Sequence, residues 1–150
     1  MKNNELEKFL DLNTDHYFKK TKHIILKNKD IRLALAFAIN RKQIVEKVSK
    51  CGQAAAYSFT PPGSAGYEPD TNVPFNPELA RSLLADSGYE NGDGFPVLEI
   101  LFNTSEGHRK IALAIQQMWQ ENLGISVELV NQDWKVYLAR EMTGDFQISR

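Results

Sequence analysis

The second half of the chain alternates strand and helix patterns, and this alternation restricts the fold more than any other feature. Ile125, Val127 and Leu129 alternate with polar residues, as in a strand with one buried face. Gly124 and Gly144 are suited to end the helical patterns before them. The expected elements are, in order, strand 97–102, helix 105–122, strand 125–130, helix 133–142 and strand 145–148. Such a β-α-β-α-β series predicts an α/β fold with a parallel-rich sheet, right-handed crossovers and packed helices.

The first half contains a helix pattern at residues 31–39 that is apolar on every side. We therefore expect this helix, capped by Asp30, to be the most buried element of the molecule. Asn40 and Gln43 have the spacing of a capping box, which predicts a second helix that runs to about Ser49.

A loop rich in proline and glycine follows at residues 57–77. Loops of this length inside a compact domain usually have a function or wrap over another part of the protein. An Asn-Pro pair at 76–77 then provides a helix cap and a proline at the first helical position. In this helix we expect Leu79, Leu83 and Leu84 to face the core.

Length and charge limit the domain organisation and the partners. A chain of 150 residues predicts a single domain over residues 1–150, with a weakly structured N-terminal arm at 1–26 that contains only poor strand candidates. Residues 1–50 carry a net charge of +6 and residues 51–150 a net charge of −7, for a total of −1. The basic residues form no dense run, so we expect no nucleic-acid partner. We also expect a monomer.

Other features bear on the compartment of the protein. The single cysteine, Cys51, has no partner for an internal disulfide and cannot anchor a metal cluster alone. No apolar run reaches the roughly 18 residues that a membrane span needs. The N-terminus lacks the apolar stretch of a signal peptide. From this pattern we expect either a cytoplasmic protein or a piece of a larger one.

The segment from Asn103 to His108 is the strongest candidate for a ligand site. It joins an expected strand to an expected helix, where free backbone N–H groups and the positive end of the helix dipole favour an anion. Arg150 follows another expected strand. If the two strands are neighbours, Asn103, His108 and Arg150 converge on one crevice that suits a carboxylate. The alternative is that Ser105 only caps the helix and that His108 is solvated.

The sequence contains no familiar catalytic or metal-binding signature. The chain has no nucleophile elbow, no glycine-rich phosphate loop and no His-Glu-x-x-His motif. Ser105 and His108 stand three residues apart, but no acid is evident to orient the histidine. We therefore expect no catalytic residues, no cofactor and no metal. Trp119 and Trp134 lie on helical stripes, which predicts that both pack in the core.

Several motifs carry a resemblance to a known family. Residues 30–45 read Asp-Ile-Arg-Leu-Ala-Leu-Ala-Phe-Ala-Ile-Asn-Arg-Lys-Gln-Ile-Val, and residues 57–62 read Tyr-Ser-Phe-Thr-Pro-Pro. Further motifs follow in order at 76–89, 101–106 and 115–138. Together they resemble the bacterial extracytoplasmic solute-binding proteins of family 5, the receptors of oligopeptide and dipeptide ABC importers, over about residues 15–150.

The resemblance implies one lobe of a type II periplasmic-binding-protein-like clamshell, the lobe called domain III, in a larger two-lobed receptor. It implies an oligopeptide ligand, an ABC transporter permease as partner, and a periplasmic or lipoprotein location. In the family, the residues that match His108 and Arg150 receive the peptide carboxylate, and the match to Asn103 lines the cleft. The position of a family lysine is occupied by Ser49 here, with Lys47 and Lys50 beside it.

Two alternatives to an oligopeptide receptor remain open at this point. A receptor of the same family could carry a murein peptide, a dipeptide or a nickel chelate. A small cytoplasmic enzyme of the α/β class is the other alternative.

Overall fold

The computed structural model describes residues 24–60, 63–69 and 72–150. Most of the expected N-terminal arm therefore lies outside the described residues. The elements are, in order, η1 Ile24–Lys27, α2 Lys29–Phe37, α3 Arg41–Gln43, η2 Ile44–Ser49, α4 Pro77–Asp86, η3 Glu90–Gly92, β1 Leu98–Asn103, α5 Glu106–Leu123, β2 Val127–Gln132, α6 Trp134–Thr143 and β3 Ile148–Ser149. The strand candidate at residues 24–26 was wrong, because these residues belong to the 3-10 helix η1.

The three strands form one parallel sheet in the order β2-β1-β3, which confirms the β-α-β-α-β prediction. The last strand begins later than expected, at Ile148. Asp145 is still part of the exit from α6, because its amide donates to the Arg140 carbonyl at 2.9 Å. In return, Arg140 Nε donates to the Asp145 carbonyl at 2.8 Å. This exchange holds the chain in a turn after Gly144, so pairing with β1 starts only beyond it.

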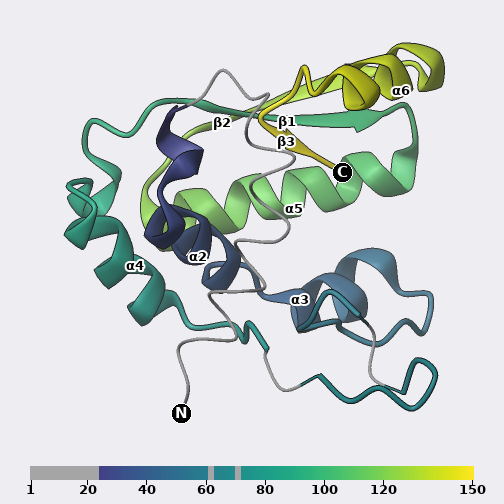
Figure 1. Cartoon of the computed structure of the whole chain (residues 1–150), viewed down its shortest axis with the longest axis horizontal. Coiled ribbons are helices and arrows are strands. Elements are labelled where there is room, and N and C mark those ends of the chain that lie inside the picture. The colour runs from purple at the N-terminus through teal and green to yellow at the C-terminus, as the bar shows by residue number, and fades with distance from the viewer. Residues whose placement is uncertain (1–23, 61–62, 70–71) are drawn as a thin grey trace.

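The sheet separates two layers of helices, with α6 on one face and α5 on the other (Figure 1). Leu98, Ile100 and Phe102 of β1 belong to the main core, together with residues of α5, α2 and α4. Leu101 points to the opposite face and is also fully buried. On that face, Arg140 of α6 lies 3.4 Å from the Glu99 carboxylate. The central strand is therefore covered on both sides.

Helix α2 is buried as its composition predicts, but its cap differs. Asn28, not Asp30, caps the helix, and its side chain accepts a hydrogen bond from the Asp30 amide at 2.8 Å. The Trp119 indole donates to the Leu35 carbonyl at 2.8 Å and so joins α5 to α2. Over the predicted range 31–39, six of nine residues are buried, which equals the share in β1, where four of six are buried. The predicted helix and the central strand are therefore buried to the same extent.

Two expectations about apolar side chains were also wrong. Leu79 is 40% exposed, because Ala80 and Leu84 are the residues of α4 that turn toward the core. Trp134 is 59% exposed at the first position of α6, where it stacks on Tyr137 with ring centroids 5.7 Å apart.

The predicted Asn76 cap of α4 was confirmed, since the Asn76 side chain accepts a hydrogen bond from the Leu79 amide at 3.0 Å.

The burial of α2 leads to a stability prediction. Phe37 is 8% exposed within the core, so Phe37→Asp should reduce the free energy of unfolding by more than about 3 kcal/mol through burial of an unpaired charge. Ile24→Asp is the matched control, because Ile24 is 79% exposed and the change should cost less than about 0.5 kcal/mol. Urea denaturation followed by circular dichroism measures both. Equal losses for the two variants would contradict the assignment of Phe37 to the core.

Candidate ligand-binding site

The carboxyl end of β1 opens into the loop that leads to α5. Thr104 ties this loop to β2, because its amide donates to the Gln132 carbonyl at 2.8 Å and its hydroxyl donates to Asn131 Oδ1 at 3.0 Å. Ser105 occupies the N-cap position of α5 with extended backbone, but its hydroxyl makes no capping hydrogen bond. The simple capping role considered for Ser105 is therefore not observed. A rigid loop thus presents the first amides of an 18-residue helix without a side-chain cap.

His108 lies in the first turn of α5 and is half-buried. Its Nδ1 is 2.5 Å from Oδ1 of Asn103, the last residue of β1. Since an amide oxygen can only accept, Nδ1 carries the proton and donates to Asn103. In the neutral ring, Nε2 is then an acceptor, and it becomes a donor only when the imidazole is protonated. Asn103 therefore sets both the orientation of the ring and the chemistry of its other nitrogen.

Arg150 extends the pairing of β3 with β1, because its amide donates to the Leu101 carbonyl at 3.0 Å. Side chains alternate along a strand. Ile148 packs against the main core on the α5 side, so alternation directs Arg150 to that side as well. The pKa of His108 is lowered, first by burial and second by the positive charge of Arg150. The structure thus brings Asn103, His108 and Arg150 together at adjacent strand ends.

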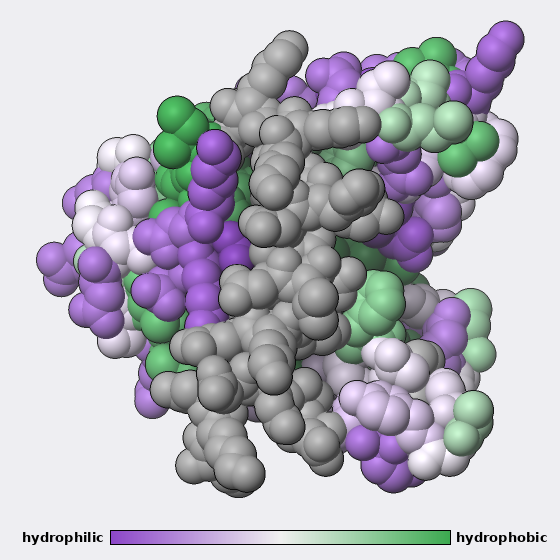
Figure 2. Space-filling model, viewed as in Figure 1, coloured by the Kyte–Doolittle hydropathy of each residue, from purple (hydrophilic) through white to green (hydrophobic). Residues whose placement is uncertain are grey.

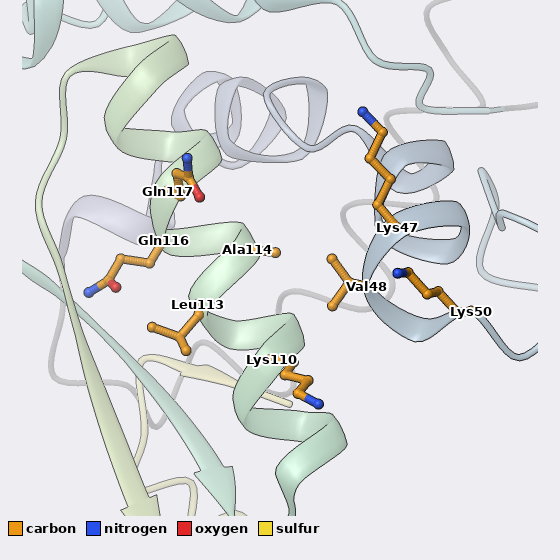
Figure 3. Close-up of a pocket in the computed structure, with 8 residues that line it drawn as sticks. All are labelled: Lys47, Val48, Lys50, Lys110, Leu113, Ala114, Gln116 and Gln117. Carbon is orange, nitrogen blue, oxygen red and sulfur yellow. The ribbon is translucent and has the colours of Figure 1, made fainter.

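Lys47 and Lys50 lie at a different place. They extend from η2 and its C-terminal cap, across a hollow from Lys110 of α5 (Figure 3). This hollow has a volume of about 610 Å³. Its other lining residues are Val48, Leu113, Ala114, Gln116 and Gln117. Neither His108 nor Arg150 lines it, so the structure does not unite the two lysines with the pair at the strand ends.

The space-filling view shows the molecule hollowed at the right, between an upper part with α6 and the start of α5 and a lower part with α3 and η2 (Figure 2). A second cavity, of about 380 Å³, lies on the β2 side of α5. It is lined by Phe102, Thr104, Ser105, Glu106, Arg109, Leu113, Leu129 and Asn131. Arg109 was missed by the sequence reasoning, although it follows His108 directly on a helix start.

A hydrogen-bonded group on α6 and β3 was also missed. The Tyr137 hydroxyl donates to Glu141 Oε1 at 2.6 Å, and the Ser149 hydroxyl donates to the same oxygen. Tyr137 and Ser149 also lie within hydrogen-bonding distance of each other, at 3.1 Å. The spacing of four between Tyr137 and Glu141 was the available signal, since residues four apart meet on a helix.

This surrounding affects the titration of the tyrosine. Burial raises the pKa of Tyr137 above its usual value, and the hydrogen bond with Glu141 adds to the effect. The positive charge of Arg150 acts in the opposite direction. The charge of Arg150 therefore lowers the pKa of His108 on one side of the strand end and that of Tyr137 on the other.

Among the described residues, no group of three or more His, Cys, Asp or Glu side chains has the arrangement of a metal site. No helix in the described part of the chain is long and apolar enough to cross a membrane. No hydrogen bond joins the Ser105 hydroxyl to His108 there, so the two do not form a nucleophile-base pair.

Known proteins are similar to this chain in both sequence and fold. The family described as "Bacterial extracellular solute-binding proteins, family 5 Middle" matches residues 2–150. The periplasmic murein peptide-binding protein MppA of Escherichia coli is 40% identical over 147 residues, which are 93% of this chain and 27% of that protein. The periplasmic oligopeptide-binding protein OppA of Salmonella typhimurium is 38% identical over 80% of this chain and 23% of its own length.

Solved structures agree with these relatives. The unliganded open form of MppA superimposes with a TM-score of 0.78 at 38% identity, covering 87% of this chain and 26% of that chain. Haemophilus influenzae OppA in complex with the peptide RPPGFSPFR gives a TM-score of 0.71 at 33% identity, covering 86% and 27%. The chain spans about a quarter of the length of these relatives. It belongs to the bacterial extracellular solute-binding proteins of family 5.

Proposed function

We propose that this chain is part of one lobe of a two-lobed extracytoplasmic receptor that binds oligopeptides for uptake by an ABC transporter, and that it is not an enzyme. One observation carries this proposal: His108 and Arg150 meet at the carboxyl ends of β1 and β3, in a chain whose relatives are named as peptide-binding proteins. Ligands of open α/β sheets bind at this end of the strands.

The chemistry of the group suits a peptide carboxylate. The Arg150 guanidinium can hold both carboxylate oxygens in parallel hydrogen bonds. His108 adds a second donor when protonated, and the α5 amides near Ser105 favour negative charge. The peptide main chain would be bound like an added strand, which is independent of sequence. Lys47 and Lys50 remain candidates for a ligand that extends over the first half of α5.

The rest of the receptor is proposed from the family. Residues 1–150 would form a single unit of the lobe, and the complete protein would be a monomer located in the periplasm or held outside the cell as a lipoprotein. Its partner would be the transporter permease. A murein peptide is the second candidate cargo, because the 40% identical relative is named for that ligand.

The direct test is a double comparison of residue and ligand end group. In the full-length receptor, Arg150→Ala should weaken a free-acid peptide by about 1–3 kcal/mol, the range for loss of a charged hydrogen bond. The same substitution should reduce the affinity for the peptide with an amidated C-terminus much less. Arg81→Ala is the control, because this exposed arginine lies on α4 and lines neither cavity near α5. Calorimetry over tri- to pentapeptides would contradict the proposal if acid and amide lost equal affinity at every length.

The lowered pKa of His108 leads to a pH prediction. At neutral pH the free ring is uncharged, and a bound carboxylate would raise its pKa, so binding takes up a proton. Affinity for free-acid peptides should therefore rise as the pH falls through the pKa of the complex, and level off below the lowered pKa of free His108. Calorimetry between about pH 5 and 8, where the peptide carboxylate stays ionised, measures this. His108→Gln should remove the dependence. A flat profile in the parent receptor would mean that His108 does not contact the carboxylate.

The isolated chain should bind peptides weakly. A receptor that closes two lobes over its ligand gains contacts from both, while the entropy cost of ordering the peptide is the same for one lobe. Titration of residues 1–150 with a mixed tri- to pentapeptide set should therefore give no affinity at the micromolar level, which corresponds to about −8 kcal/mol. Sub-micromolar binding would indicate that the whole site lies within this chain.

A further inference from the structure

Helix α6 carries an aromatic pair and a carboxylate along one face. Trp134, Tyr137 and Glu141 are spaced by three and four residues, so they follow one another on the same side of the helix. The Trp134 and Tyr137 rings are stacked with an interplanar angle of 18°, and the Trp134 ring is largely exposed. The Tyr137 hydroxyl then donates to Glu141. Aromatic faces and carboxylates both attract cations.

The two oxygens of the Glu141 carboxylate have different surroundings. Oε1 accepts hydrogen bonds from the Tyr137 and Ser149 hydroxyls, which fix the position of the group. Oε2 accepts no hydrogen bond from the described residues, and no cation of the described chain lies within ion-pair distance of Glu141. A carboxylate that is oriented through one oxygen and free at the other is prepared to receive a further donor.

Glu141 and Arg150 flank the end of β3 from its two sides. Ser149, which donates to Glu141, directly precedes Arg150 in the chain. Alternation along the strand puts Ser149 on the α6 side and Arg150 on the α5 side. Figure 1 shows the C-terminal end of the chain between α6 and α5. A ligand end group at this strand end would therefore meet a positive charge on one side and a negative charge on the other.

We propose that Glu141 is a specificity-determining residue that binds a cationic side chain on the C-terminal residue of the peptide, while Arg150 binds the carboxylate of the same residue. The inference rests on the proposed function and adds a ligand class to it: peptides that end in a lysine-like residue. A purely structural role would leave Glu141 as a tie between α6 and β3, with no effect on the choice of ligand.

The experiment separates these roles with matched ligands and variants. Ala-Ala-Lys and Ala-Ala-norleucine differ in the terminal ammonium, and each is used as free acid and as amide. Glu141→Gln removes the charge but keeps an acceptor for both hydroxyls. Tyr137→Phe removes one hydroxyl and keeps the charge. Binding is measured by calorimetry on the full-length receptor, and thermal melting verifies that each variant is folded.

The parent receptor should prefer the lysine peptide by about two- to five-fold, the range of one solvent-exposed ion pair. Glu141→Gln should abolish this preference, and Tyr137→Phe should retain it. The inference is overturned if the parent shows no preference, if Glu141→Gln keeps it, or if Glu141→Gln strengthens both peptides equally. Each of these results leaves unchanged the preference of the receptor for the free-acid peptide over its amide. If the parent receptor bound acid and amide with equal affinity, the proposed function would be overturned instead.

Discussion

The rest of the structure depends on the burial of β1 on both faces. Its main-chain groups pair with β2 and β3, while Ile100 and Leu101 are buried against opposite helix layers. A strand in this environment has no room for an unpaired polar side chain along its length. Polar side chains that are free to bind a ligand are therefore expected at the strand ends. Asn103, the last residue of β1, is the first point at which a ligand could meet a polar side chain, and the one at which His108 is oriented.

The apolar periodicity predicted much of this architecture. Periodicity and the glycine helix stops indicated that strand and helix alternate from residue 97 onward, and parallel pairing follows from that order. The sequence left open whether the first and last of these strands are neighbours, and Asn103, His108 and Arg150 could be grouped only on that condition. The structure meets the condition, because β3 lies beside β1. Sheet topology is set by many residues, so single errors do not overturn it.

The helix caps and the placement of individual side chains could not be predicted from apolar periodicity, because they depend on where each helix begins and on local contacts. Trp134 was expected in the core because it lies on a helical stripe, yet it begins its helix and stacks on the outside of Tyr137. Asn28 replaced Asp30 as a cap because helix α2 starts two residues earlier than expected. Lys47 and Lys50 were considered together with His108 through a resemblance, but they line a hollow that neither His108 nor Arg150 lines. For α2, a shift of two residues in the helix start was enough to change the capping residue.

The electrostatics of the strand end couple Arg150 to His108. Arg150 is exposed and forms no ion pair within the described residues, and its charge lowers the pKa of His108. The positive charge of Arg150 disfavours protonation of the His108 ring. In the proposed site, a bound carboxylate would favour protonation instead, because it attracts both positive charges. Binding of the carboxylate and protonation of His108 would therefore support each other.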